Sequence, residues 1–164
     1  MPRGVISADD PLADDVRELL ERHLAYAKAT TAPEDVHALE VEALLDPSVT
    51  FFSFRADGEL LGVAALQRLD GEHAEIKSMH TAEAARGRGI GRAMVDHLIG
   101  VAREAGYRRI SLETGAGPAF TAARRLYASA GFTPCGPFGA YEPSSKSAYM
   151  TLSLEGPVTQ AGPA

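Results

Sequence analysis

Apolar residues near the start of the chain recur with the period of a helix. Between Leu12 and Leu24 they lie mostly three or four positions apart, which predicts an amphipathic helix after a helix-start signal at residues 7–11. A short extended segment around residues 5–6 precedes this helix. Residues 34–45 predict a second helix, which an Asp-Pro pair ends.

The pattern then changes to one that is typical of β-strands. Three segments are rich in β-branched, aromatic or other apolar residues, and an Asp-Gly dipeptide separates each segment from the next. Such dipeptides favour the positive φ angles of tight hairpin turns. The predicted strands are residues 49–54, 60–66 and 72–81, with turns at 57–58 and 70–71, and together they predict an antiparallel meander.

The second half of the chain alternates helices with strands. A continuous apolar stripe predicts a helix over residues 90–105, and a glycine ends it. A strand follows at 109–114, a further helix at 118–130, then a loop and a last strand at 148–154. Two strands joined by a helix of this length predict a parallel pair with a right-handed crossover. The predicted fold class is therefore mixed α+β, with about four helices.

Composition narrows the class of protein. The 164 residues suffice for one core, so residues 1–154 are predicted to form a single domain and residues 155–164 a short flexible tail. A net charge of −6 argues against a nucleic-acid partner, and no apolar run is long enough to cross a membrane. The single cysteine, Cys135, excludes an internal disulfide and fits a cytoplasmic location. The histidines show no spacing typical of a metal site.

A glycine-rich loop stands between the third predicted strand and the helix that follows it. The segment Arg-Gly-Arg-Gly-Ile-Gly at residues 86–91 combines glycines, which let a backbone approach a ligand closely, with a helix N-terminus. Arg86, Arg88 and Arg92 add positive charge, so the segment suits a pyrophosphate. A P-loop motif is absent, and a dinucleotide fingerprint counted from Gly87 would need a glycine at Arg92. A surface turn that binds nothing remains the alternative.

These residues resemble the GNAT superfamily of acetyltransferases. Arg86-x-x-Gly89-x-Gly91 matches the (Q/R)xxGx(G/A) signature of that family, whose loop grips the pyrophosphate of coenzyme A. The triplet at residues 79–81 stands where the family's central strand ends, and residues 123–132 resemble its AxxLYxxxGF segment. The resemblance covers residues 49–154. It implies a central, mostly antiparallel sheet with one splayed parallel pair of strands, and acetyl-coenzyme A as co-substrate.

The resemblance also implies which residues contact the cofactor. Backbone groups of Met79 and Thr81 would bind the pantetheine, and an N–H near Met79 or His80 would polarise the thioester carbonyl. Phe120 stands where the family often has an asparagine that touches the pantetheine, and the glycine-rich stretch 115–117 offers backbone contacts instead. The predicted cofactor-binding residues are Met79, His80, Thr81, Arg86, Gly87, Arg88, Gly89, Ile90, Gly91, Arg92 and Phe120.

Tyr127 is the predicted general acid. The resemblance assigns it to protonate the leaving thiolate of coenzyme A, and a phenol holds its proton at neutral pH. Tyr127 also shares a helical face with Phe120 and Ala123, so a purely structural place in the core is the alternative.

Glu75 is the predicted general base. Alternation along the strand places it on the same face as Met79, whereas His80, the rival base, should point to the opposite face. A salt bridge between Glu75 and Lys77 is the structural alternative, and a chain of water molecules would make either base unnecessary.

The function implied by the resemblance is N-acetyl transfer from acetyl-coenzyme A to a primary amine. The acceptor is expected to be a small molecule and the transfer to be direct, within a ternary complex. A protein or peptide acceptor, or a sensor that binds acyl-coenzyme A without turnover, are the alternatives. Many members of the family dimerise, so a homodimer is compatible with the chain. The expected walls of the acceptor pocket are Tyr26, Phe138, Tyr141, Glu142 and Ser147.

Overall fold

The computed structural model describes residues 4–30 and 41–154. Within these residues a mixed sheet has the strand order β1-β2-β3-β4-β5-β7-β6. Its strands are β1 (Val5–Ala8), β2 (Val49–Ala56), β3 (Glu59–Arg68), β4 (His73–Thr81), β5 (Arg109–Gly115), β6 (Thr133–Cys135) and β7 (Ser147–Ser153). The α-helices are α1 (Asp14–Thr30), α2 (Ile90–Glu104) and α3 (Thr121–Ser129).

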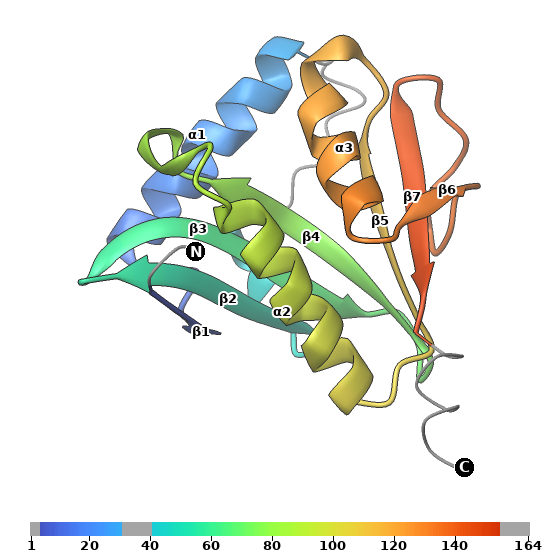
Figure 1. Cartoon of the computed structure of the whole chain (residues 1–164), viewed down its shortest axis with the longest axis horizontal. Coiled ribbons are helices and arrows are strands. Elements are labelled where there is room, and N and C mark those ends of the chain that lie inside the picture. The colour runs from blue at the N-terminus through green and yellow to red at the C-terminus, as the bar shows by residue number, and fades with distance from the viewer. Residues whose placement is uncertain (1–3, 31–40, 155–164) are drawn as a thin grey trace.

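The sheet is antiparallel except between β4 and β5. That parallel pair is short, because only 73–76 of β4 pair with 109–112 of β5. Beyond this point the two strands diverge, and Figure 1 shows β4 and β5 close together at one end and apart at the other. The predicted meander of β2, β3 and β4, the splayed parallel pair and the mixed α+β class are confirmed.

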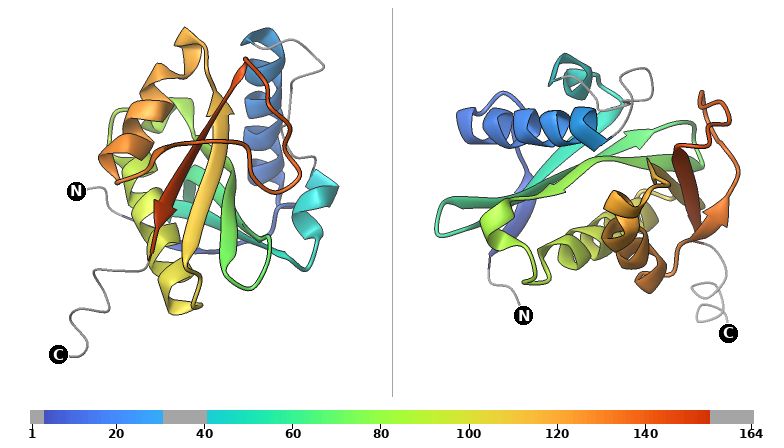
Figure 2. Two further views of the ribbon diagram at one scale, coloured as in Figure 1. Left: turned by 90° about the vertical axis from the view of Figure 1, so that its right-hand side faces the viewer. Right: turned by 90° about the horizontal axis from the view of Figure 1, so that it is seen from above.

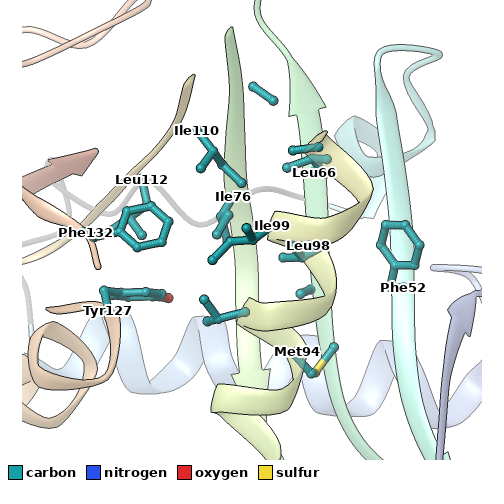
Figure 3. Close-up of a cluster of buried hydrophobic side chains, with 14 of the residues drawn as sticks. Phe52, Leu66, Ile76, Met94, Leu98, Ile99, Ile110, Leu112, Tyr127 and Phe132 are labelled. Atoms are coloured by element: carbon teal, nitrogen blue, oxygen red, sulfur yellow. The ribbon is translucent and has the colours of Figure 1, made fainter. Parts of the chain in front are cut away.

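Helices cover both faces of the sheet. Figure 2 shows α1 on one face and α2 with α3 on the other. Alternate residues of β3 point to opposite faces of the sheet. Ala64 and Leu66 belong to the hydrophobic cluster under α2, whereas Val63 and Ala65 pack with α1. A strand that is covered on both faces is apolar throughout, which explains the uninterrupted hydrophobic sequence of β3. Figure 3 shows the larger cluster, to which α2 contributes Met94, Leu98 and Ile99.

A β-bulge interrupts β4 just before its end. Val63 lies opposite His80, but Ala65 lies opposite Lys77, so β4 uses one residue more than β3 over the same length. Ser78 has a φ angle of 54°, in the left-handed region that is unusual for a residue with a side chain. The extra residue exchanges the two faces of the strand beyond the bulge.

The bulge overturns one expectation from the sequence. Glu75 and Met79 were expected on the same face, but Met79 packs against the cluster under α2, and Glu75 lies opposite Gln67 on the face that carries Val63 and Ala65. His80, opposite Val63, shares the face of Glu75. Strict alternation fails here because a bulge adds one residue to one strand only.

Other differences concern short segments. The predicted helix at 34–45 lies partly outside the described residues, and Val41–Leu45 forms a 3-10 helix. The helix predicted from residue 118 starts with a 3-10 turn, Pro118–Phe120, before α3. The strand β6 was not predicted, since three residues with a central proline carry no alternation; it pairs with β7 at the edge of the sheet, where proline is tolerated. The tail at 155–164 lies outside the described residues.

Candidate functional site

The glycine loop leads into the start of α2, where the first backbone N–H groups have no partner among the residues that the structure describes. Gly87 and Gly89 have φ angles of 79° and 82°, which favour glycine, and Gly89 caps the helix without any side-chain hydrogen bond. The N–H of Ala93 donates to the carbonyl of Gly89, so the N–H groups of residues 90–92 precede the first bond of the helix. An uncapped helix N-terminus with a glycine approach is a site for an anionic group.

Two of the three arginines of the loop are exposed charges. The side chains of Arg86 and Arg88 are exposed, and neither forms an ion pair with another residue that the structure describes. The Arg92 side chain instead bonds Asp96 at 3.0 Å and the Ser129 hydroxyl at 3.2 Å, which ties α2 to α3. Arg92 can therefore offer a ligand its backbone N–H, while Arg86 and Arg88 offer their guanidinium groups.

The end of β4 meets the start of α2 at Gly91. A β-carbon on Gly91 would lie 3.0 Å from Leu126 Cδ2, 3.7 Å from Thr81 Oγ1 and 3.8 Å from Met79 Cε. The fold thus brings the residues predicted to contact the pantetheine next to those predicted to contact the pyrophosphate. The absence of a side chain at Gly91 permits this close approach, because Leu126 of α3 already fills the space.

Phe120 packs over the end of β5. A β-carbon on Gly115 would lie only 2.1 Å from Phe120 Cδ2, so the ring covers that glycine. The carbonyls of Gly115 and Gly117 accept hydrogen bonds of 2.6 and 2.9 Å from Arg124, and the N–H of Ala116 donates to the Lys146 carbonyl. These groups already have partners within the chain, which weakens the expectation that stretch 115–117 contacts a cofactor.

Tyr127 lies buried on the α2 side of the sheet. Its ring meets that of Phe132 edge to face with centroids 5.9 Å apart, and Figure 3 shows its oxygen pointing from α3 towards α2 and β4. No hydrogen bond to this hydroxyl occurs among the described residues. Burial raises the pKa of Tyr127 far above its ordinary value, so the phenol keeps its proton throughout the neutral range. The group is a proton donor in an apolar setting.

Glu75 lies buried on the other face, with 3% of its surface exposed. The Tyr141 hydroxyl donates to its Oε2 at 2.6 Å, and the Lys77 ammonium lies 3.8 Å from its Oε1. Burial raises the pKa of Glu75, although both of these contacts oppose the shift. A carboxylate with a raised pKa accepts a proton more readily than an ordinary one, which suits a general base.

Aromatic rings fix the segment that supplies Tyr141. Phe138, Tyr141 and Tyr149 pack against one another with centroids between 5.2 and 6.0 Å apart. The Tyr149 hydroxyl also donates to the carbonyl of Glu142 at 2.9 Å. The loop before β7 is thereby held against the sheet on the Glu75 side.

Glu113 is a second carboxylate of this site, and the sequence analysis missed it. Its Oε2 accepts a hydrogen bond of 2.6 Å from the Ser147 hydroxyl, and its charge raises the pKa of both Glu75 and Tyr141. In the sequence Glu113 is one of several polar residues in a strand where polar and apolar residues alternate, and no motif marks it. Glu75 pairs with Ser111 of β5, and Glu113 follows Ser111 by two residues. Glu113 therefore lies on the same face of the sheet as Glu75.

The structure therefore groups the predicted residues on two faces of the sheet. On the α2 side lie Met79, Thr81, Tyr127 and the glycine loop. On the other side lie Glu75, His80 and the expected pocket walls Phe138, Tyr141 and Ser147. Glu142 contributes its carbonyl there, and the side chain of Tyr26 lies outside the described residues.

Residues 4–30 and 41–154 contain neither a candidate membrane span nor a cluster of metal-binding side chains. No helix there is long and apolar enough to cross a bilayer. No group of three or more His, Cys, Asp and Glu side chains there is arranged to hold a metal ion.

Known proteins resemble this chain in sequence and in fold. The model of the Acetyltransferase (GNAT) family matches residues 13–132. The chain belongs to this family. It is 40% identical to the uncharacterised N-acetyltransferase YsnE of Bacillus subtilis (strain 168), over 91% of this chain and 99% of the relative. It is 38% identical to the uncharacterised N-acetyltransferase YedL of Escherichia coli (strain K12), over 91% and 94%.

A solved structure shares the fold. The acetyltransferase of Bacillus subtilis in complex with CoA superposes with a TM-score of 0.71 at 19% identity, over 93% of this chain and all of that one. The chain is thus a GNAT acetyltransferase that depends on acetyl-coenzyme A as co-substrate. The uncapped start of α2, the left-handed glycines and the exposed Arg86 and Arg88 fit the pyrophosphate of that molecule.

Proposed function

We propose that this acetyltransferase moves the acetyl group to a primary amine of a small molecule, by direct transfer within a ternary complex. One observation carries the proposal: a buried carboxylate and a buried phenol, both with raised pKa values, stand on opposite faces of the sheet. Glu75 suits proton removal from an ammonium, and Tyr127 suits protonation of a thiolate. The reaction needs both transfers.

The cofactor-binding roles follow from the positions of the backbone groups. The N–H groups of residues 90–92 and the guanidinium groups of Arg86 and Arg88 hold the pyrophosphate. Backbone groups of Met79 and Thr81 hold the pantetheine, beside the start of α2. An N–H near Met79 or His80, in the bulge of β4, polarises the thioester carbonyl.

The proton transfers complete the reaction. Glu75 removes one proton from the substrate ammonium, the amine nitrogen forms a bond to the acetyl carbon, and this nitrogen then loses its second proton to solvent. As the bond between this carbon and sulfur breaks, Tyr127 donates its proton to the thiolate. Solvent returns a proton to Tyr127 and takes one from Glu75. His80 shares the face of Glu75 and is the rival base.

Ligand-dependent unfolding tests the first step of this proposal. Acetyl-coenzyme A or coenzyme A should raise the unfolding midpoint by several degrees, since a ligand at ~100 times its Kd adds about 2.7 kcal/mol of stability. NAD and ATP serve as controls. A shift with NAD or ATP but with neither coenzyme form would contradict the assignment of the glycine loop.

Initial velocities then test the order of events. With varied amine and acetyl-coenzyme A, direct transfer predicts double-reciprocal lines that intersect. Parallel lines would indicate a covalent acetyl-enzyme and overturn direct transfer. Acetylation of peptides without acetylation of small amines would overturn the proposed class of acceptor. Binding of acetyl-coenzyme A without any turnover would indicate that the protein is a sensor of acyl-coenzyme A.

A further inference from the structure

We infer that the acceptor's ammonium binds beside Glu75 Oε1 and over the Tyr141 ring, where the Lys77 ammonium now lies, and that the acceptor is an amine without a carboxylate. This inference rests on the proposed function and names its substrate class. It follows from the contacts of Glu75, from the charges around it and from the way in which Tyr141 is held.

The two oxygens of Glu75 are engaged to different degrees. Oε2 accepts a hydrogen bond of 2.6 Å from Tyr141, whereas Oε1 has the Lys77 ammonium at 3.8 Å, beyond hydrogen-bond distance. The weaker contact is the one that an incoming group displaces. Oε1 is therefore the oxygen that receives the substrate's proton, while Oε2 stays bonded to Tyr141.

Lys77 marks a place that suits a cation. Its Nζ lies 5.9 Å from the centroid of the Tyr141 ring, within the range of a cation–π contact, in addition to its contact with Glu75. A substrate ammonium in this place would make the same two contacts. The Lys77 side chain, with 17% of its surface exposed, is long and flexible enough to withdraw.

The surrounding charge selects against a carboxylate. Glu113, held by Ser147, lies near enough to raise the pKa of Glu75 and of Tyr141 by its charge. Among the residues that the structure describes, the charges that act on Glu75 are those of a second carboxylate, Glu113, and of one ammonium, that of Lys77. A cationic amine is attracted to this cluster, whereas the α-carboxylate of an amino acid adds a third negative charge. Acetylation removes the positive charge of the amine, so the neutral amide loses both contacts and leaves.

Tyr141 is a positioning residue for the base. Its ring is fixed between Phe138 and Tyr149, and its hydroxyl holds one oxygen of Glu75. Burial and the charge of Glu75 raise the pKa of Tyr141, so the hydroxyl remains the donor of that hydrogen bond. The other oxygen of Glu75 is thereby aimed at the substrate.

Matched acceptors that differ only in the carboxylate test the substrate class. Phenethylamine is compared with phenylalanine, and 3-methylbutylamine with leucine, by kcat/KM at saturating acetyl-coenzyme A. Each amine should exceed its amino acid by at least about tenfold. The variant Glu113→Gln keeps a hydrogen-bond acceptor for the Ser147 hydroxyl and removes the negative charge of Glu113. It should therefore lower the ratio of kcat/KM for the amine to kcat/KM for the amino acid. Glu104→Gln, an exposed position at the end of α2, is the control that should leave it unchanged.

The outcomes separate this inference from the proposed function. If the amino acids react as well as the amines, or if Glu113→Gln leaves the ratio unchanged, the inference fails while amine acetylation stands. If acetyl-coenzyme A binds and no amine or amino acid is acetylated, the proposed function itself fails.

The variant Tyr141→Phe tests the positioning role of Tyr141. The acid limb of its pH profile should move to higher pH, because a hydrogen bond that stabilises the Glu75 carboxylate is lost. An unmoved limb would overturn the role of Tyr141.

Discussion

Glu75 and His80 lie on the same face of β4, although five positions along the strand would place them on opposite faces in a regular ladder. The bulge at Ser78 causes this, and the regular register with β3 is interrupted between Lys77 and His80. A bulge takes backbone groups out of the regular ladder. In the proposed reaction the bulge has two consequences: it brings His80 to the face of Glu75, and it places the backbone near Met79 at the proposed thioester site.

Replacement of Tyr127 by phenylalanine should separate catalysis from binding. The ring keeps its contact with Phe132, so packing should be preserved, while the proton donor is lost. We expect kcat to fall at least about tenfold, within the range of acid–base catalysis, with coenzyme A affinity nearly unchanged. Steady-state kinetics and a binding titration measure the two effects. An unchanged kcat would leave Tyr127 as a core residue only.

Glu75→Gln should lose activity, by about 10²-fold in kcat if Glu75 is the base. The acid limb of the pH profile should disappear with it, because the glutamine does not ionise. Persistence of that limb at the same pH would point to another base, with His80 the first candidate on this face. Glu104→Gln is again the control.

The substitution Glu75→Gln should also stabilise the protein at high pH. Burial raises the pKa of Glu75 in the folded chain, so the folded chain holds this proton to a higher pH than the unfolded chain does. The free energy of unfolding consequently falls as pH rises through the raised pKa. The gain in unfolding midpoint of Glu75→Gln over the wild type should therefore grow as pH rises from the ordinary glutamate range. A gain that shrinks with pH would contradict the raised pKa.

Lys77→Met should change the pH profile and the acceptor affinity together. The charge of Lys77 lowers the pKa of Glu75, so its loss should move the acid limb to higher pH. Above that limb, the KM for phenethylamine should fall, because no resident cation competes for Oε1 of Glu75. A higher KM throughout the pH range would mean that Lys77 helps to bind the acceptor.

Gly89→Ala should weaken cofactor binding. Gly89 has a φ angle of 82°, so a side chain there strains the loop or forces it to rearrange. The KM for acetyl-coenzyme A should rise about tenfold or more, since the N–H groups of residues 90–92 would no longer be presented in the same way. The matched control is Gly100→Ala in the middle of α2, where a β-carbon meets nothing within 4 Å. It should leave KM unchanged and stabilise the helix by roughly 0.5–1 kcal/mol.

Local sequence patterns predicted most of the architecture. The meander followed from three apolar segments and two Asp-Gly turns, because both signals depend on residues close in the chain. The glycine loop and Tyr127 were found in the same way, as short motifs at fixed spacing. The strand β6, with three residues and a proline, was missed, since its pairing with β7 is formed by the fold and not by a local pattern.

The amino-acid sequence by itself determined the order of elements, the glycine loop that is proposed to bind the pyrophosphate, and the family to which the chain belongs. Only the tertiary structure decided which side chains meet. Glu75, Glu113 and Tyr141 come from distant segments, and their contacts depend on the register of β4 with β5 and on the docking of the loop before β7. The bulge at Ser78 decided that His80, and not Met79, shares a face with Glu75. The spacing of apolar residues and the propensity of residues for helix, strand or turn are local properties of the sequence. Strand register, bulges and clusters of charged side chains arise from long-range packing.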